Sequence, residues 1–340
     1  MSDKVVLGGV EGGSSHTVTH LYTPEGELLA EYVYPDGCNH WQIGYEKAWE
    51  IIRDSVTSAL KSAGLSPMTT LQCLGLSLSG VEGETVAEEY RQGISKAYPS
   101  LSHKYLVCSD TLGSVYTVRN NGGLVLISGT GSNSLIVNPN MKTFQCGGWG
   151  YMLGDEGSAY LLVREAVKAC INAFEGFQPV LHPTDRVWKL LGDDWGVASI
   201  PDLLPVFYKD FKKSRVAGLC VKLAHLARDG DALSRSLFEQ TGSWLGDMVN
   251  CLVPKADREL LIGPGGLPIV CVGNVWKSWD LLKPGFIAAI RERGVLTEFS
   301  LISAKCSAAA GAAYLAARHH SLPFTYQPEM MGQEIFHWKA

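Results

Sequence analysis

A carboxylate and a turn of small hydroxyl residues follow two successive apolar runs in the first half of the chain. Leu106–Cys108 ends at Ser109 and Asp110, and Leu124–Ile127 ends at the turn Ser128–Asn133. Apolar runs that are broken by turn residues indicate buried strands. Asp110 can accept a proton, and the turn offers hydroxyls and backbone N–H groups with no bulky side chain to keep a phosphate away. The pair predicts phosphoryl transfer to an alcohol.

Capping is an alternative role for the acidic residues. Asp110 precedes a helix expected over Thr111–Val118, and Asp is a favoured N-cap residue. The two roles of Asp110 are compatible. The pair Asp155–Glu156 also precedes an expected helix, but the glycine-rich run at 147–157 favours backbone that approaches a ligand closely.

A second glycine-rich stretch, Gly8–Ser15, follows the first expected strand. The sequence contains no GxxxxGK[ST] motif, and the stretch leads into a strand, which argues against a P-loop and against a dinucleotide fingerprint. Taken alone, the stretch fits a ligand-free hairpin as well as it fits a phosphate loop. Its equivalence to Ser128–Asn133 in the second half of the chain favours the phosphate interpretation.

Three consecutive residues, Asn39, His40 and Trp41, offer an amide, an imidazole and an aromatic face. This combination suits a sugar. Trp41 could equally lie in the core, and His40 fits a loop residue better than a metal ligand.

The elements that must position these residues occur in nearly the same order twice. The first half has expected strands at 4–10, 16–22, 27–33, 71–78 and 105–108, and expected helices at 41–63, 83–98 and 111–118. The second half has expected strands at 124–127, 134–137, 142–145, 268–272 and 296–302, and expected helices at 158–173, 279–291 and 307–318. Self-similarity of this kind predicts a duplicated unit.

The expected fold is therefore α/β, with two domains around a cleft. Residues 1–120 form a smaller N-terminal domain, and residues 121–320 form a larger one that contains a helical insertion at about 177–262. The tail at 321–340 is expected to pack back on the first domain. In each copy the first hairpin would present small residues at its tip, so the two tips could hold a phosphate chain from both sides.

Composition limits the classes of partner. The chain has 340 residues, 46% of them hydrophobic, a net charge of −5 and a pI of about 6.0, with scattered basic residues. These values do not favour nucleic acid or an anionic membrane. No signal peptide or apolar run of about 20 residues is present, so we expect a cytoplasmic protein. The nine widely spaced cysteines predict reduced thiols and not a disulfide scaffold or a zinc site.

Seven segments along the chain together carry a family resemblance. They are Gly8–Gly13, Asn39–Trp41, Gly75–Gly80, Leu126–Asn133, Cys146–Gly150, Gly154–Tyr160 and Leu267–Trp279. They resemble the eukaryotic N-acetylglucosamine kinases, a family of the sugar kinase, Hsp70 and actin superfamily. The runs DEGSAY and VWKS make the resemblance specific. It implies a duplicated actin-like ATPase core of the ribonuclease H-like type.

The resemblance also implies roles for matching positions. Asp110 matches the catalytic base, which takes the proton of the sugar 6-hydroxyl as it attacks the γ-phosphate of ATP. The matches to sugar contacts are Asn39, Asp110, Ser132, Gly148, Trp149, Gly150, Tyr151, Met152 and Asp155. The residues assigned to ATP are Gly13, Ser15, Thr130, Gly131, Ala217, Gly273 and Ser278. Glu11 stands where a residue positions Mg²⁺, often through water.

Two positions depart from the family pattern. Ser15 stands where threonine is usual and keeps the hydroxyl, and Tyr151 stands where the mammalian pattern has histidine. The resemblance implies a homodimer that uses ATP and Mg²⁺ to make N-acetylglucosamine 6-phosphate in amino-sugar salvage. The alternatives are an ATPase that activates a partner through an iron–sulfur cluster, for which no paired cysteines are obvious, and a catalytically silent scaffold.

Overall fold

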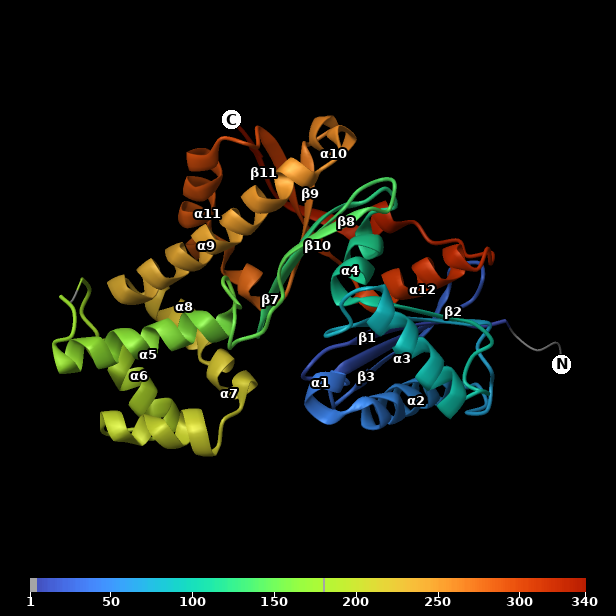
Figure 1. The fold of residues 1–340 in the computed structure, drawn as a ribbon, viewed down its shortest axis with the longest axis horizontal. Coiled ribbons are helices and arrows are strands. Elements are labelled where there is room, and N and C mark those ends of the chain that lie inside the picture. The colour runs from blue at the N-terminus through green and yellow to red at the C-terminus, as the bar shows by residue number, and fades with distance from the viewer. Residues whose placement is uncertain (1–4, 180) are drawn as a thin grey trace.

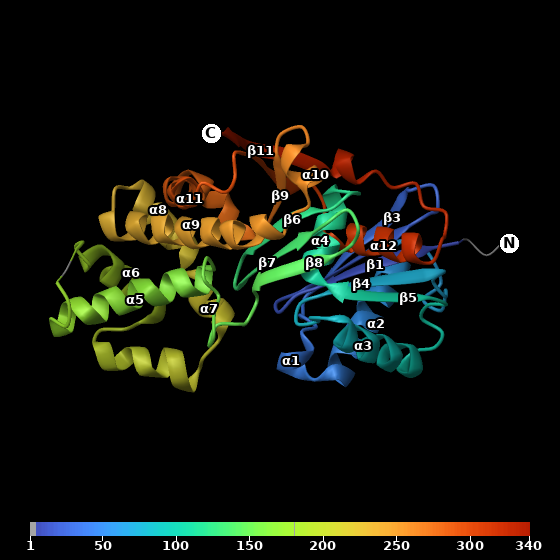
Figure 2. The ribbon, with the colours of Figure 1, turned by 45° about the horizontal axis from the view of Figure 1, so that its top comes forward.

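The first of two β-sheets forms the N-terminal lobe. The computed structural model describes residues 5–179 and 181–340 (Figures 1 and 2). The strand order is β3-β2-β1-β4-β5, in which β1, β2 and β3 pair antiparallel while β1, β4 and β5 pair parallel. The strands are β1 (Leu7–Gly12), β2 (Thr17–Tyr22), β3 (Leu28–Tyr34), β4 (Cys73–Leu78) and β5 (Tyr105–Ser109).

The second sheet repeats the first and adds one strand. Its order is β11-β10-β9-β6-β7-β8. The strands are β6 (Gly123–Ser128), β7 (Ser132–Val137), β8 (Thr143–Gly147), β9 (Leu267–Val272), β10 (Glu298–Ala304) and β11 (Gly332–Lys339). The run β8-β7-β6-β9-β10 has the same order and directions as the first sheet. The predicted duplicated α/β core is confirmed.

Two long helices cover the outer face of the first sheet. They are α2 (Tyr45–Ser62) and α3 (Glu84–Ala97), preceded by the short α1 (His40–Ile43). Buried side chains of α2, such as Ile52 and Val56, pack with Leu74 and Leu76 of β4. The helix expected at 41–63 is interrupted at Gly44, whose φ of 80° favours glycine.

Helices α4 (Asp110–Val118) and α12 (Ala308–His319) lie between the two sheets (Figure 1). Helix α12 packs on β1 and β4, and α4 contacts α12, β6 and β7. The two helices cross closely, because a Cβ atom on Gly311 would lie 2.1 Å from the carbonyl oxygen of Gly113. Although α12 follows β10 of the second sheet, it returns to the first sheet, in contrast to its expected place in the second domain.

The larger lobe carries the remaining helices. They are α5 (Ala159–Glu175), α6 (Asp185–Trp195), α7 (Lys213–Gly218), α8 (Cys220–Arg228), α9 (Ala232–Leu252), α10 (Arg258–Ile262) and α11 (Trp279–Arg293). The expected insertion is thus helical, and its apolar faces share one buried core with β6 and β9. Within residues 5–179 and 181–340, no helix is long and apolar enough to cross a membrane.

The C-terminal tail divides between the lobes. Thr325 donates a backbone hydrogen bond to Pro24, and Phe324 packs on Tyr22 of the first lobe. Strand β11 instead pairs antiparallel with β10 at the edge of the second sheet. Its Phe336 packs against Phe299 in the core of that lobe. Residues 332–339 therefore lie on the second lobe, in contrast to the expectation for the whole tail.

Candidate functional site

Asp110 is the first residue of α4 and directly follows β5. The N-cap of α4 is Ser109, whose hydroxyl accepts a hydrogen bond from the backbone N–H of Leu112 at 3.3 Å. The interpretation of Asp110 as the N-cap is therefore wrong. The Oδ1 atom of Asp110 is buried and has no hydrogen-bond partner among the described residues. This oxygen is thus available to accept a hydrogen bond from a ligand.

The surroundings of Asp110 tune its acidity. Burial raises the pKa of Asp110 to about 6, and the negative charge of Glu11 adds to this effect. Hydrogen bonds from the Ser79 hydroxyl and from the Thr111 backbone act in the opposite direction. A carboxyl group with a pKa near neutrality can accept a proton in the pH range where a general base must work.

The Ser79 hydroxyl hydrogen-bonds to this carboxylate, and Asn39 contacts Ser79 in turn. Asn39 caps α1 by accepting a hydrogen bond from the Trp41 backbone at 3.0 Å, and its amide donates to the Ser79 hydroxyl at 3.5 Å. Trp41 is 74% exposed and is therefore not a core residue. Its indole N–H donates to the carbonyl of Gly80 at 2.9 Å. The turn after β4 thus fixes both Asn39 and the aromatic face beside it.

His40 does not lie in a loop as expected. It begins α1 and is buried, with its ring stacked on Tyr45 at 4.5 Å and edge-on to Tyr90 at 5.7 Å. Burial lowers the pKa of His40. The residue therefore acts as a core aromatic that supports Asn39.

Glu82 connects the two lobes and was missed by the sequence analysis. It follows β4 in the first lobe, and its carboxylate accepts a hydrogen bond from the amide of Asn133 on β7 of the second lobe at 3.2 Å. Burial raises the pKa of Glu82 to about 7, and the charge of Asp110 contributes. Asp110 and the β6–β7 hairpin therefore belong to one interlobe site.

The turn between β6 and β7 is held rigidly. The hydroxyls of Ser128 and Ser132 donate to the carbonyls of Gly157 and Glu156 at 2.5 and 2.6 Å. The backbone N–H of Gly129 bonds to Gly131 within the turn. Because both serine hydroxyls are occupied inside the lobe, the turn keeps its shape without a ligand.

Asp155 lies behind this turn. Its side chain is only 2% exposed, and its φ of 72° is rare for a residue other than glycine. One carboxylate oxygen accepts a hydrogen bond from the Ser132 backbone at 3.2 Å, and the other lies 2.6 Å from the ammonium of Lys213. Lys213 belongs to α7 in the helical insertion, and the sequence analysis also missed it.

The glycine-rich loop after β8 presents two kinds of side chain. Gly148 and Gly150 have positive φ, as a loop with tight turns requires. Trp149 and Met152 project into solvent. Tyr151 instead packs against aromatic rings of α5 and of the segment before α7. Of the predicted sugar contacts in this loop, Trp149 and Met152 are open to a ligand.

The residues predicted to contact ATP lie on both lobes. Gly13 and Ser15 form the tip between β1 and β2, and Ser15 is exposed. Gly273 directly follows β9 with a φ of 103°, and a Cβ atom there would lie 2.3 Å from the carbonyl oxygen of Ser128. Gly273 thus packs against the turn that carries Thr130 and Gly131. The remaining two, Ala217 on α7 and Ser278 just before α11, are buried in the second lobe.

Glu11 was expected to position Mg²⁺. One of its carboxylate oxygens accepts hydrogen bonds from the Ser307 hydroxyl and from the Ala308 backbone at 3.0 Å. The described residues contain no group of three or more His, Cys, Asp or Glu side chains that could hold a metal. Mg²⁺ commonly keeps several waters and binds through substrate phosphates, so a single carboxylate acting through water fits this ion.

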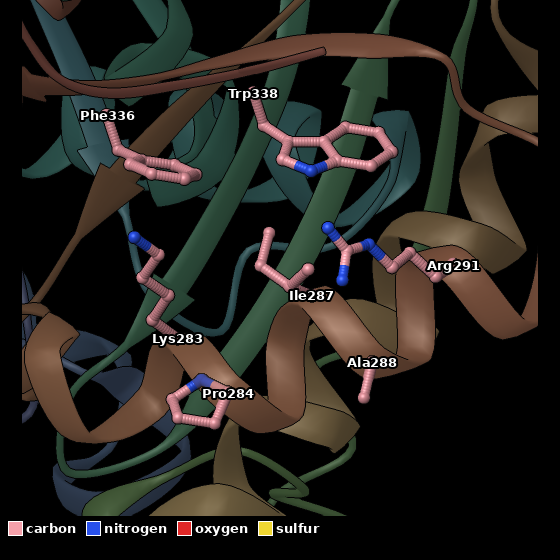
Figure 3. Close-up of a pocket in the computed structure, with 7 residues that line it drawn as sticks. All are labelled: Lys283, Pro284, Ile287, Ala288, Arg291, Phe336 and Trp338. Atoms are coloured by element: carbon pink, nitrogen blue, oxygen red, sulfur yellow. The ribbon is translucent and has the colours of Figure 1, made fainter. Parts of the chain in front are cut away.

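A groove on the second lobe is distinct from this site. It lies between α11 and β11, where Phe336 and Trp338 face Lys283 and Arg291 (Figure 3). The ammonium of Lys283 lies 4.6 Å from the centre of the Phe336 ring. None of the predicted site residues lines this groove, which instead shows how β11 is held on the lobe.

Comparison with known proteins places the chain among ATPases and their relatives. The sequence model of the BadF/BadG/BcrA/BcrD ATPase family matches residues 9–316. The N-acetyl-D-glucosamine kinase of Dictyostelium discoideum is 22% identical over 331 residues, which cover 93% of this chain and 98% of the relative. The N-acetylmuramic acid/N-acetylglucosamine kinase of Clostridium acetobutylicum is 25% identical over 251 residues, or 72% and 78% of the two chains.

Solved structures show the same fold. A Chromobacterium violaceum protein assigned as an N-acetylglucosamine kinase superposes with a TM-score of 0.71 at 24% identity, covering 92% of this chain and 99% of that one. A ROK family glucokinase of Streptomyces griseus, in complex with glucose and AMPPNP, gives a TM-score of 0.60 at 14% identity with the same coverage. The predicted actin-like ATPase fold is confirmed.

Proposed function

Because the chain belongs to the BadF/BadG/BcrA/BcrD ATPase family, we propose that it is an ATP-dependent kinase that phosphorylates the 6-hydroxyl of N-acetyl-D-glucosamine. The product is N-acetylglucosamine 6-phosphate. Membership of an ATPase family supports ATP as the phosphate donor. The names of the two relatives support N-acetylglucosamine as the acceptor. A homodimer and a cytoplasmic location are further expectations from the family resemblance and stay predictions.

The observation that carries the proposal is the contact between Glu82 and Asn133. Glu82 lies close enough to Asp110 for the charge of one carboxyl to raise the pKa of the other. Its hydrogen bond to Asn133 then brings this pair to the rigid turn Ser128–Asn133 of the other lobe. The proposed proton acceptor of the first lobe is thus linked to the turn of the second lobe that is predicted to hold phosphate, and phosphoryl transfer requires both at one site.

The proposed reaction follows from these positions. The 6-hydroxyl oxygen forms a bond to the γ-phosphorus of ATP while the bond from that phosphorus to the β–γ bridging oxygen breaks, which releases ADP. Asp110 receives the hydroxyl proton, and the hydrogen bond from Ser79 holds its carboxylate in place. Backbone N–H groups of the turn at Thr130 stabilise the phosphate oxygens. Glu11 would be the residue that positions Mg²⁺, often through water, and the ion would supply positive charge to neutralise the phosphates.

N-acetylglucosamine should be a better substrate than glucose. The two sugars differ only at C2, where the acetamido group would contact the loop around Trp149 and Met152. Loss of apolar contacts alone should lower kcat/KM by about 10–200-fold, and loss of buried polar partners should lower it further. A coupled ADP-release assay over hexoses and N-acetylhexosamines measures this ratio. Equal kcat/KM for both sugars would refute the proposed acceptor.

The acid limb of the pH profile should report Asp110. The carboxylate is active only when ionised, and its pKa is raised to about 6, so kcat/KM should fall as the pH drops through about 6 and level off above it. The charged groups Glu11 and Glu82 also face Asp110, but neither is the proposed base. The fall in kcat/KM at low pH should therefore persist in the Glu82→Gln variant. A profile that is flat from pH 5 to pH 8 would argue against Asp110 as the base.

A further inference from the structure

Lys213 brings a positive charge to the interlobe site. Neither glycine-rich turn contains a lysine or an arginine, at 8–16 or at 128–133. The ammonium of Lys213 enters from the helical insertion and lies 2.6 Å from the carboxylate of Asp155. A Cβ atom on Gly131 would lie 2.8 Å from the same nitrogen. Lys213 therefore reaches the middle of the turn that is expected to hold phosphate.

The surroundings keep this ammonium at the turn but leave it accessible. The rings of Tyr151 and Tyr160 lie 5.8 and 6.0 Å from the nitrogen, and Phe211 packs against both rings. These rings shield the charge from part of the solvent and attract it through their faces. The Lys213 side chain is nevertheless 23% exposed, whereas that of Asp155 is 2% exposed. Of the two partners of the ion pair, Lys213 is thus the one that a ligand can reach.

Asp155 cannot serve the sugar fully while it is paired in this way. Its carboxylate is predicted to accept a sugar hydroxyl, yet one oxygen is held by the Ser132 backbone and the other by Lys213. The γ-phosphate of ATP is a stronger attraction for an ammonium than a single carboxylate, because it carries more charge. Binding of ATP at the turn would therefore draw Lys213 toward the phosphate and free one oxygen of Asp155.

We propose that Lys213 is a further catalytic residue, which pairs with Asp155 in the free protein and binds the γ-phosphoryl group when ATP is present. The inference rests on the proposed function, since it assigns the cation of that same site. Lysine is a compact, mobile point charge and suits a group that changes partner. Cations that contact a transferring phosphoryl group stabilise the charge that develops on it.

The test compares two nucleotides that differ by the γ-phosphate. The ligands are ADP and AMPPNP, each with Mg²⁺, and their Kd values are measured by calorimetry on the full chain. In Lys213→Met the Kd of AMPPNP should rise by at least about tenfold and that of ADP by less than about twofold, because only AMPPNP has the contacted group. The kcat should fall by about 10²-fold, and Lys213→Arg should restore part of it.

Lys222→Met is the matched control. Lys222 forms an ion pair with Asp194 on the surface of the same insertion, so the change is chemically identical but lies outside the site. All its constants should stay near those of the wild type. Should Lys213→Met fail to fold because Asp155 is left as a buried unpaired charge, the double variant with Asp155→Asn removes both charges, and it should still lose the preference for AMPPNP.

Two results would overturn the inference. One is an equal change in the Kd of both nucleotides, and the other is an increase in the sugar KM alone, which would mean that Lys213 only holds Asp155. The same data separate this inference from the proposed function. A wild-type preference for AMPPNP that depends on Lys213, without phosphorylation of any N-acetylated sugar, would leave the lysine assignment intact and refute the acceptor.

Discussion

Replacing Asp110 by Asn is expected to lower kcat at saturating sugar by about 10²–10⁴-fold, the usual contribution of general-base catalysis. The amide has nearly the same shape as the carboxylate but cannot accept the proton. Binding of ATP should change little, because Asp110 is not among the residues predicted to contact the nucleotide. The sugar KM should rise moderately, since a charge-assisted hydrogen bond to the hydroxyl is replaced by a neutral one.

The same substitution should not destabilise the fold. Ser109, and not Asp110, caps α4, so the helix keeps its N-terminal hydrogen bond. Burial raises the pKa of Asp110 to about 6, above its value in an unfolded chain, which means that folding disfavours the ionised form. Stability from this group is therefore lost as the pH rises through that range. At pH 7.5 the Asn variant should melt at the wild-type temperature or above it.

Ser109→Ala is the control that separates the two roles. It removes the cap and should cost about 0.5–2 kcal/mol of stability while kcat stays within a few-fold of the wild type. The measurements are kcat and the melting temperature for both variants. A stable Asp110→Asn protein with near wild-type turnover would rule out Asp110 as the base, and Asp155 would be the next candidate.

The residues that the sequence identified are those whose role is visible locally. Asp110 and the turn Ser128–Asn133 each end an apolar run, so a short window of sequence shows them, although their strands β5 and β6 belong to different sheets. The duplicated order of elements was predictable for the same reason, because period-two and helical patterns are properties of short windows. The choice between Ser109 and Asp110 as the N-cap of α4 was not predictable, since both residue types are good caps and the two are neighbours in the chain.

The residues that were missed act across the fold. Glu82 matters because Asn133, which is 51 positions away, approaches it from the other lobe. Lys213 matters because a short helix of the insertion brings it to Asp155. No local pattern encodes either contact. Strand β11 did leave a signal, the alternation of Phe336 and Trp338 with polar residues, but its position on the second sheet depends on its pairing with β10.

Replacing Gly75 by Ala is expected to destabilise the protein by about 3 kcal/mol or more, at the upper end of what one added methyl group costs in a packed interior. Gly75 of β4 pairs in register with Gly9 of β1, and together they form the flat surface on which α12 packs. A Cβ atom on Gly75 would lie 1.9 Å from the carbonyl oxygen of Ala312. This neighbour is backbone within a helix and cannot rotate away.

Gly263→Ala is the matched control for this prediction. Gly263 has a negative φ, and its added Cβ would come no closer than 3.4 Å to any atom, so its stability should change by less than about 0.5 kcal/mol. Thermal and denaturant unfolding of both variants provide the comparison. A loss below about 1 kcal/mol for Gly75→Ala would mean that α12 is not in close contact with β4. Since the first turn of α12 holds Glu11, a shifted α12 should also weaken the response of turnover to Mg²⁺, which links the packing of these glycines to the site.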